Sequence, residues 1–528
     1  MLNAELKEAG SMKRWIPVLF VLVVALMLLF SAAAMADGIL EAVNEFPDEA
    51  FRIALDRMYA DGKHYIDFPN IKKLHLDGWN IMDITGIEYF PNLEELSISN
   101  NHLTSLTPLR NCPKLRILDC RGNPLSTIDT SPFSNLQGLY CSGEQLTSLA
   151  IAGNAATLKD LYVSNVGFTS LDLGGFNALV NLTCGGGGKL SGLDVSGLPN
   201  LEYLHCSCPL TSLNVSDCSK LIQITLENCK FSSLSISGLQ SLVNLDCRDN
   251  SVPMSNLTVS SCPALEEIDC ENSRLSAISV SGCDEFVGLN CSGNNLTSLD
   301  GISTLFELDC SDNQISQLGA FPALIDLNCA NNRLTTLSVT ESVENLVCSG
   351  NQLTSLDLSQ CPNMAVVYCT DNALTSLNVS GCSVLDWIHA YGNQLTSIDI
   401  SGTGLDDAQD VIKTEYENRI VMMYGSLFFD TTTTLQNGGT VLYAPDGSNI
   451  PLPTLFLPAD LTTIDSEAFN GIAAEAVYIP GSVETIVGDP FAGEHVKYIY
   501  GYYYTAAEDF ANAHSDRYTF VPLVQSSH

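Results

Sequence analysis

The sequence has few basic residues. Its 528 residues include 23 lysines and arginines against 60 aspartates and glutamates, which gives a formal net charge of −37 at pH 7. Binding to nucleic acid or to an anionic membrane surface needs basic patches, so we expect neither kind of partner. The charge favours solubility in a salty exterior, and it would also attract a basic or metal-bridged partner.

The sequence also lacks recognisable catalytic and metal-binding motifs. H-E-x-x-H, G-x-S-x-G and C-x-x-C do not occur, and the eight histidines are scattered without a pair at ligand spacing. The run of four glycines before Lys189 does not form a phosphate loop, because Leu190 stands where that motif needs serine or threonine. We therefore expect no enzymatic activity, no cofactor and no bound metal.

Long hydrophobic runs are absent except at the N-terminus. Lys13 and Arg14 precede an apolar stretch, residues 16–30, and Ala34 and Ala36 stand at the −3 and −1 positions of a cleavage site. This arrangement is typical of a secretory signal peptide, and the apolar stretch is short for a membrane span. We expect the mature protein to be secreted or loosely associated with the cell surface, and not embedded in the membrane.

What the sequence does contain is a pattern that returns about every 21 residues. Residues 346–353, L-V-C-S-G-N-Q-L, return as residues 367–374, V-Y-C-T-D-N-A-L, and each copy continues T-S-L-x-x-S. A period of this length indicates a solenoid, in which neighbouring repeats must stack to close a core. Alternation along a short strand places Leu346 and Cys348 inside. Asn351 then turns the chain, because its amide can bond backbone groups that a tight bend leaves unpaired.

The pattern L-x-x-L-x-[L/C]-x-x-N-x-L resembles the leucine-rich repeat (LRR). The resemblance implies an α/β solenoid, a horseshoe or arc with parallel strands on one face, a helical N-terminal cap and a short second LRR segment at the C-terminus. The inward position equivalent to Cys348 occurs in sixteen copies, with spacings of 19 to 23 residues. These are Leu76, Ile98, Cys120, Cys141, Val163, Cys184, Cys206, Leu226, Cys247, Cys270, Cys291, Cys310, Cys329, Cys348, Cys369 and Ala390.

Nineteen cysteines in a secreted chain would ordinarily indicate disulfides, but their positions argue against them. Eleven occupy the inward strand column, where neighbouring rungs lie about 4.8 Å apart. A disulfide needs Cβ atoms about 3.8 Å apart with a defined torsion. We therefore predict free thiols that act as small hydrophobic residues. Cys208 and Cys229, at or near the position of the turn asparagine, are the pair that could form a bridge.

Five segments follow from these patterns: the signal peptide (1–36), a helical cap (37–70), about sixteen LRRs (71–402), a helix and linker (403–440), and a C-terminal segment (441–525). The cap helix is expected over 46–59 with Pro47 at its first position, and the second helix over 405–420. The phrases at 457–469, 479–491 and 499–514 resemble the BspA-like subclass of LRR proteins. As a whole, the chain resembles a secreted bacterial LRR protein.

Most outward strand positions hold a small polar residue. The candidate ligand-binding residues are the aromatic and histidine exceptions at these positions. One aromatic group contains Tyr140, Tyr162, Tyr203 and His205, and a second contains Tyr368, Trp387, His389 and Tyr391. Aromatic residues with a polar edge are enriched in recognition surfaces. The alternatives are local stacking between rungs and, for the second group, coverage by the C-terminal segment. Between the two groups runs an acidic stripe: Asp246, Glu267, Asp269, Glu271, Glu307, Asp309 and Asp326.

The LRR resemblance implies a non-enzymatic recognition or adhesion protein that binds an extracellular protein or glycan of a host or neighbouring cell. The acidic stripe would favour a basic partner. A passive structural component of a cell-surface layer is the alternative from another class. A secreted hydrolase is a third, for which the sequence offers no catalytic set.

Overall fold

The computed structural model divides into two compact units. Unit 1 comprises residues 1–274 and 279–286, and unit 2 comprises residues 275–278 and 287–528. The predicted signal peptide lies outside the residues that the structure describes. Described are residues 39, 42–59, 66–186, 188–299, 302–407, 411–416, 419–424, 427–430, 432–437, 440–443, 454–457, 461–464, 476–491, 496–502 and 505–523.

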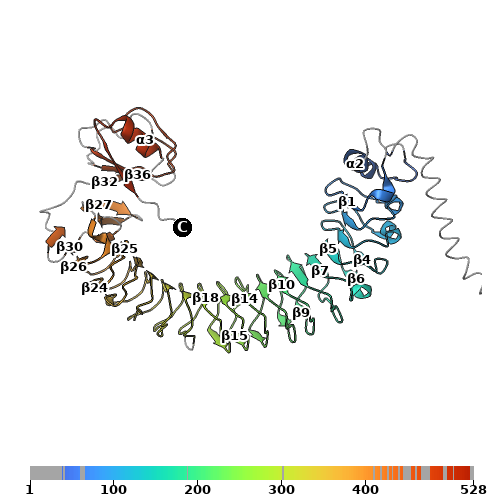
Figure 1. Ribbon diagram of the computed structural model, residues 1–528, viewed down its shortest axis with the longest axis horizontal. Coiled ribbons are helices and arrows are strands. Elements are labelled where there is room, and N and C mark those ends of the chain that lie inside the picture. Colours follow the sequence, from blue (N-terminus) through green and yellow to red (C-terminus); the bar gives the residue numbers. More distant parts are fainter. Residues whose placement is uncertain are drawn as a thin grey trace, which may run out of the picture. The chain divides into compact units, whose positions relative to one another are not determined.

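Unit 1 begins with a helical cap over the first repeat (Figure 1). Helix α2 covers Glu49–Tyr59 and is capped by Asp48, whose Oδ1 accepts a hydrogen bond of 2.8 Å from the backbone N–H of Phe51. The other oxygen, Oδ2, accepts from the N–H of Met82 in the first repeat, also at 2.8 Å. Asp48 therefore joins the cap to the solenoid. Pro47 precedes the helix and does not occupy the first helical position that the sequence predicted.

Each repeat of unit 1 contributes one short strand to a parallel ladder. The leucine or isoleucine at the centre of each strand pairs in register with the next, as in Leu74 with Leu96 and Leu96 with Leu118. The strands are β1 (Lys73–His75), β2 (Glu95–Ser97), β3 (Ile117–Asp119), β5 (Gly138–Ser142), β7 (Asp160–Ser164), β8 (Asn181–Gly185), β10 (Tyr203–Cys206), β12 (Gln223–Leu226), β14 (Asn244–Asp246) and β16 (Glu267–Asp269).

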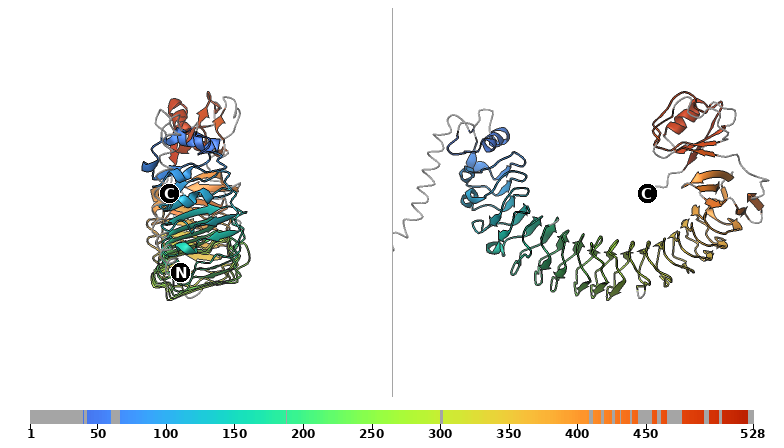
Figure 2. Two further views of the ribbon diagram at one scale, coloured as in Figure 1. Left: turned by 90° about the vertical axis from the view of Figure 1, so that its right-hand side faces the viewer. Right: turned by 180° about the vertical axis from the view of Figure 1, so that it is seen from behind.

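Unit 2 continues the pattern with its own parallel ladder. Its strands are β18 (Gly288–Asn290), β19 (Glu307–Asp309), β20 (Asp326–Asn328), β21 (Asn345–Val347), β23 (Val366–Tyr368) and β25 (Trp387–His389). The stacked turns of each unit can be followed from two further sides in Figure 2. The predicted LRR solenoid with parallel strands on one face is confirmed.

A second set of short strands lines the far side of the turns, at the run L-T-S-L-D-L-S (353–359) and its equivalents in other repeats. These strands pair in parallel with their neighbours, as in β4 with β6 and β22 with β24. They are β4 (Thr127–Asp129), β6 (Ser148–Ala150), β9 (Gly192–Asp194), β11 (Ser212–Asn214), β13 (Leu234–Ser237), β15 (Asn256–Ser260), β17 (Ala277–Ser281), β22 (Ser355–Asp357), β24 (Ser376–Asn378) and β26 (Ser397–Asp399).

Buried asparagines connect consecutive turns. The Nδ2 of Asn351 donates to the carbonyls of Cys329 (2.9 Å) and Cys348 (3.1 Å), and its Oδ1 accepts from the N–H of Leu334 (3.0 Å). Asn101, Asn123, Asn313 and Asn332 make the equivalent bonds to the preceding turn. Each of these amides satisfies backbone groups that the bend would otherwise leave unpaired in the interior.

Two repeats replace the asparagine with a smaller donor. The hydroxyl of Ser273, fully buried, donates to the carbonyl of Cys247 at 2.7 Å. The thiol of Cys229 lies 3.9 Å from the carbonyl of Cys206 and 3.6 Å from that of Glu227. The position therefore requires a donor directed at the neighbouring turn, and the hydroxyl oxygen of Ser273 also accepts from the N–H of Asn250 at 3.4 Å.

The inward column is buried in all sixteen predicted copies, none more than 1% exposed. All nineteen cysteines of the sequence are free and buried, including Cys208 and Cys229. Several thiols outside the column contact carbonyls of the preceding turn, as Cys361 does with Thr340 at 3.5 Å. Burial raises the pKa of the Cys329 and Cys369 thiols to about 12. These two cysteines are therefore held as neutral packing residues.

The segment after the last repeat differs from the prediction. In the described part of 405–420 the predicted helix is replaced by a short 3-10 turn (Gly404–Asp407), β27 (Val411–Tyr416) and the start of β28 (Arg419–Tyr424). This stretch is rich in β-branched and aromatic residues, which favour strands. The last rung of the ladder also presents an open edge that a strand can pair with.

Strand β29 (Leu427–Asp430) provides that pairing. It lies parallel to β25, with His389 opposite Phe428, and antiparallel to β28. The carboxylate of Asp430 accepts from the N–H groups of Gly392 and Asn393, both at 3.0 Å. On the far side β30 (Thr434–Asn437) pairs with β26, and β31 (Thr440–Tyr443) pairs with β30. Strands β29 and β30, which pair with the last repeat strands β25 and β26, thus close the end of the repeat core.

The C-terminal segment forms a second, short parallel ladder with a 22-residue period, as predicted. Leu455 pairs with Val477, and Val477 with Ile499. Its elements are β32 (Thr454–Phe456), β33 (Thr463–Ile464), β34 (Ala476–Tyr478), β35 (Thr485–Ile486), β36 (Tyr498–Tyr502), α3 (Ala506–Ala513) and β37 (Thr519–Leu523). Its core packs Val477, Ile499 and Phe491 against Phe510 of α3.

We expect the asparagine bonds to be a main source of stability. Asn351→Ala should lower the free energy of unfolding by about 2–4 kcal/mol, because three buried backbone groups lose their partner. Urea denaturation measures this change. The exposed Asn295→Ala is the control and should change stability by less than about 0.5 kcal/mol. Equal stability of the two variants would contradict the role given to the buried amide.

We also expect the thiols to resist alkylation in the folded protein. At about pH 8 a thiol with a pKa near 12 is almost entirely neutral, and the neutral thiol is not the nucleophile. Iodoacetamide followed by mass spectrometry should label few cysteines natively and all nineteen in denaturant. Rapid native labelling of the strand column, or absence of free thiol in denaturant, would show that the interior is not as described.

Candidate functional site

Tyrosine and arginine side chains meet on the strand face of unit 1. The rings of Tyr140 and Tyr162 lie on neighbouring rungs, with centroids 6.5 Å apart. The guanidinium of Arg121 lies 5.7 Å from the Tyr140 ring centroid and 5.2 Å from that of Tyr162. Such distances allow cation–π attraction to both rings. We call Asp119, Arg121, Tyr140 and Tyr162 the Arg–Tyr cluster.

The local sequence Asp119-Cys120-Arg121 builds the base of this cluster. Residues i and i+2 of an extended segment share a face, so Asp119 and Arg121 both point outward while Cys120 is buried. The carboxylate binds the guanidinium at two points, Nε to Oδ1 at 3.0 Å and Nη2 to Oδ2 at 2.6 Å. This hydrogen bonding raises the pKa of Arg121. Arg121 is therefore a fixed cation whose side chain remains 43% exposed.

Gly138 leaves room for Tyr140. A Cβ added at Gly138 would lie only 3.3 Å from the Tyr140 ring, so a larger residue here would displace that ring. Burial raises the pKa of Tyr140, and the nearby carboxylates of Asp160 and Asp119 raise it further. The Tyr140 hydroxyl is thus a neutral hydrogen-bonding group, and the ring stays half-buried.

The first predicted group is not one continuous cluster. Thr183 stands between Tyr162 and His205 in the register of β7, β8 and β10, which separates these two residues by two rungs, or about 10 Å. Tyr203 belongs to the other outward row, opposite Asn181, and is 44% exposed. Tyr140 and Tyr162 are brought together, whereas Tyr203 and His205 lie farther along the same face.

The second group is largely covered. His389 and Tyr391 are each only 2% exposed, and the ring of Phe428 from β29 lies 4.4 Å from His389. Tyr368 approaches His389 from the preceding rung at 4.7 Å. His389 and Tyr391 are therefore covered by β29, which belongs to the segment predicted as helix and linker (403–440), and they keep almost no exposed surface. Tyr368 and Trp387 remain half-buried.

The acidic stripe is partly neutralised. In unit 1, Asp246 is bound by Arg248 at 2.7 Å, and Arg248 also lies 3.8 Å from Asp269. Desolvation by burial raises the pKa of Asp269. In unit 2, Asp309 accepts from the Nδ2 of Asn328 at 2.8 Å and from the hydroxyl of Ser311 at 2.6 Å, so neutral donors hold this carboxylate. The negative charge is less compensated in unit 2 than around Arg248.

Sequence reasoning missed Arg121 and Arg248. Both belong to the tripeptide Asp-Cys-Arg, at 119–121 and 246–248, with the cysteine in the inward column. In a chain with few basic residues, a repeated Asp-x-Arg on an outward face was a signal for a paired, surface-held arginine.

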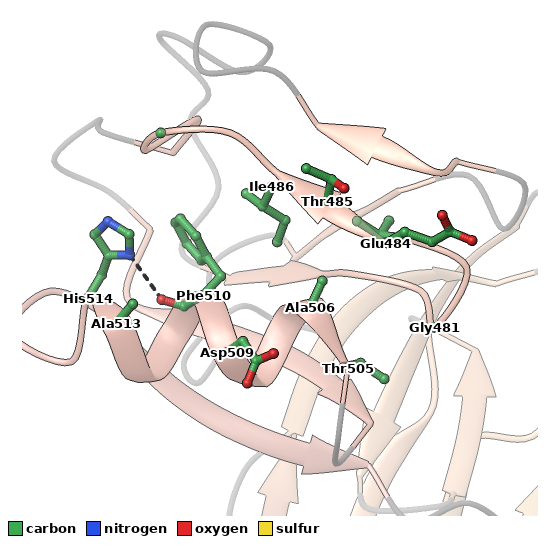
Figure 3. A pocket seen from close by; sticks show the side chains of 12 residues that line it. Gly481, Glu484, Thr485, Ile486, Thr505, Ala506, Asp509, Phe510, Ala513 and His514 are labelled. Carbon is green, nitrogen blue, oxygen red and sulfur yellow. Dashed lines mark hydrogen bonds between the residues drawn. The ribbon is translucent and has the colours of Figure 1, made fainter.

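The structure gives no sign of a catalytic centre among the described residues. No group of three or more His, Cys, Asp or Glu in the described part of the chain is placed to hold a metal ion. A groove of about 750 Å³ lies between α3 and β35 and contains Glu484, Asp509 and His514 (Figure 3). Nδ1 of His514 lies 3.0 Å from the carbonyl of Phe510 in its own helix, so the imidazole is held against α3.

Within the described ranges, no helix has the length and apolar character needed to cross a membrane.

Comparisons with known proteins identify the repeat. A family model described as Leucine Rich repeats (2 copies) matches residues 91–133. No curated protein matches the chain.

Among solved structures, the chain is similar to YopM from Yersinia enterocolitica WA-314 (19% identity, TM-score 0.46, covering 85% of this chain and 93% of that one). It is also similar to the functional domain of InlJ from Listeria monocytogenes, which includes a cysteine ladder (18%, TM-score 0.39, 73% and 96%). A third is an LRR protein of Leptospira interrogans (18%, TM-score 0.45, 63% and 90%). These likenesses concern the fold alone, and the family model identifies leucine-rich repeats at residues 91–133.

The buried His389 predicts a specific pH dependence. Desolvation lowers its pKa to about 4, so between about pH 6.5 and pH 4 the unfolded chain binds a proton that the folded chain does not. The stability of the last repeats should therefore fall as the pH drops through this window, by up to about 3 kcal/mol from this residue. His389→Phe should remove that part of the pH dependence in urea unfolding. An unchanged slope in the variant would contradict the neutral, buried imidazole.

Proposed function

We propose that this LRR protein acts in non-enzymatic recognition outside the cell. It binds a protein or glycan of a host or neighbouring cell through the strand face of its repeats. The signal-like N-terminal segment supports secretion or loose association with the cell surface. The resemblance of the C-terminal phrases to BspA-like proteins supports adhesion.

The observation that carries this proposal is the Arg–Tyr cluster. Tyrosine and arginine are the residue types most enriched at the energetic centres of interfaces. Here Asp119 holds Arg121 in place, and both tyrosine rings pack beside the guanidinium. Side chains that are ordered before binding lose little conformational entropy when a partner arrives. The cluster therefore offers a pre-organised anchor on a rigid rung.

Charge supports the choice of partner surface. The net charge of −37 favours a partner with a basic surface, and such association weakens as salt rises. Arg121 adds a fixed cation at the centre of the cluster, where a hydrogen-bond acceptor of the partner can be recognised. A partner that fits both features presents a basic rim around a polar acceptor group.

The test is an affinity measurement with a partner captured by the mature protein and then purified. Tyr140→Ala/Tyr162→Ala should raise the dissociation constant by at least about tenfold, as expected when two contact aromatics are truncated. The control is Tyr498→Ala, an exposed tyrosine of the C-terminal segment, which should leave the affinity within about twofold.

A folded double variant that keeps full affinity would disprove the role of this cluster. In that case Trp387→Ala tests whether the half-buried Trp387 contributes to binding. If it does not, the turns are the next candidate for the binding surface. Circular dichroism and urea unfolding of each variant exclude loss of fold as the cause.

A further inference from the structure

Two large apolar side chains on successive repeats of unit 2 are exposed. Phe306 is 46% exposed and Ile325 is 36% exposed. Each immediately precedes a strand, β19 or β20, and the N–H of Ile325 donates to the carbonyl of Phe306 at 2.8 Å. The N–H of Phe306 donates in the same way to the carbonyl of Val287, which is half-buried. Three apolar residues thus occupy equivalent positions on three consecutive turns, spaced by about 4.8 Å.

Acidic side chains surround this apolar row. Glu307 directly follows Phe306 and is exposed, and Asp326 follows Ile325. On the next turn the same position holds Glu344, also exposed, whose N–H donates to the carbonyl of Ile325. Among the described residues, no lysine or arginine forms an ion pair with these three carboxylates.

The local charge is almost entirely negative. Between residues 287 and 368 the sequence has eight acidic residues and one basic residue, Arg333. Arg333 lies eight residues beyond Ile325, past the far end of β20. Exposed apolar side chains in a row, bordered by carboxylates without basic partners, are a kind of surface that can mark an interaction site.

We propose that the surface formed by Val287, Phe306, Ile325, Glu307, Asp326 and Glu344 docks a basic segment of a partner protein. An apolar side chain of that segment covers Phe306 and Ile325, while flanking lysines or arginines pair with the carboxylates. A second copy of this chain is a poor occupant, because it carries the same net charge of −37. A neutral glycan would leave the carboxylates without counter-charges.

This inference rests on the proposed recognition function and specifies the chemistry of the partner. It depends on other side chains than the Arg–Tyr cluster, and these lie in the other unit. The tyrosine variants described above should therefore leave docking at this surface unchanged. If partner binding at the Arg–Tyr cluster is lost while docking at this surface remains, or the reverse, the result shows which of the two proposals has failed.

The test uses a fluorescent peptide of alternating lysine and leucine, about eight residues or roughly 26 Å long when extended. Two matched peptides carry serine in place of leucine or glutamate in place of lysine. The mature protein should bind the Lys–Leu peptide in a salt-dependent manner, and both matched peptides at least about tenfold more weakly. Phe306→Ser/Ile325→Ser should weaken binding of the Lys–Leu peptide by about tenfold or more.

Charge variants distinguish a local site from general attraction. Glu307→Gln/Glu344→Gln should weaken binding and flatten its salt dependence, whereas Glu144→Gln/Glu266→Gln removes the same charge in unit 1 and should change affinity by less than about twofold. Equal effects of the two pairs, or full binding by the folded Phe306→Ser/Ile325→Ser variant, would overturn the proposal. Peptide binding that occurs only when copies of the chain associate would also overturn the proposal, because the site is assigned to a single chain.

Discussion

The structure depends on satisfying backbone groups at the bend that ends each strand. A turn of the solenoid buries carbonyl and N–H groups that no strand pairing reaches, and a buried unpaired group is costly. One asparagine solves this on two turns at once: Asn351 bonds the carbonyls of Cys329 and Cys348 and receives the N–H of Leu334. The same bonds at Asn313 and Asn332 keep successive turns in register.

That register determines both the interior and the outer face. Inside, the small inward column accepts cysteine because a neutral thiol fills the space between rungs, and burial raises the pKa of thiols such as that of Cys369. Outside, every second strand residue is presented on a rigid frame. The Arg–Tyr cluster shows the consequence: Tyr140 and Tyr162 stand directly opposite each other, and Asp119 holds Arg121 beside them.

The sequence predicted the repeat, its phase and the free cysteines because these follow from a strict period over many copies. It could not predict which outward residues are buried by a segment that follows the repeats. His389 and Tyr391 look outward in the repeat pattern, yet β29 adds a rung that buries them. The segment 405–420 carries helical spacing of apolar residues, but its strand β27 pairs with β28, which in turn pairs with β29. Arg121 was missed because its role depends on tyrosines from two later repeats.

The structure of the protein with its captured partner tests the central claim most directly, because that claim concerns which face the partner occupies. The account predicts partner atoms within about 4.5 Å of Tyr140, Tyr162 and Arg121, on the strand face of unit 1. A partner that contacts only the far-side strands such as β4 and β6, with the Arg–Tyr cluster left in solvent, would contradict it.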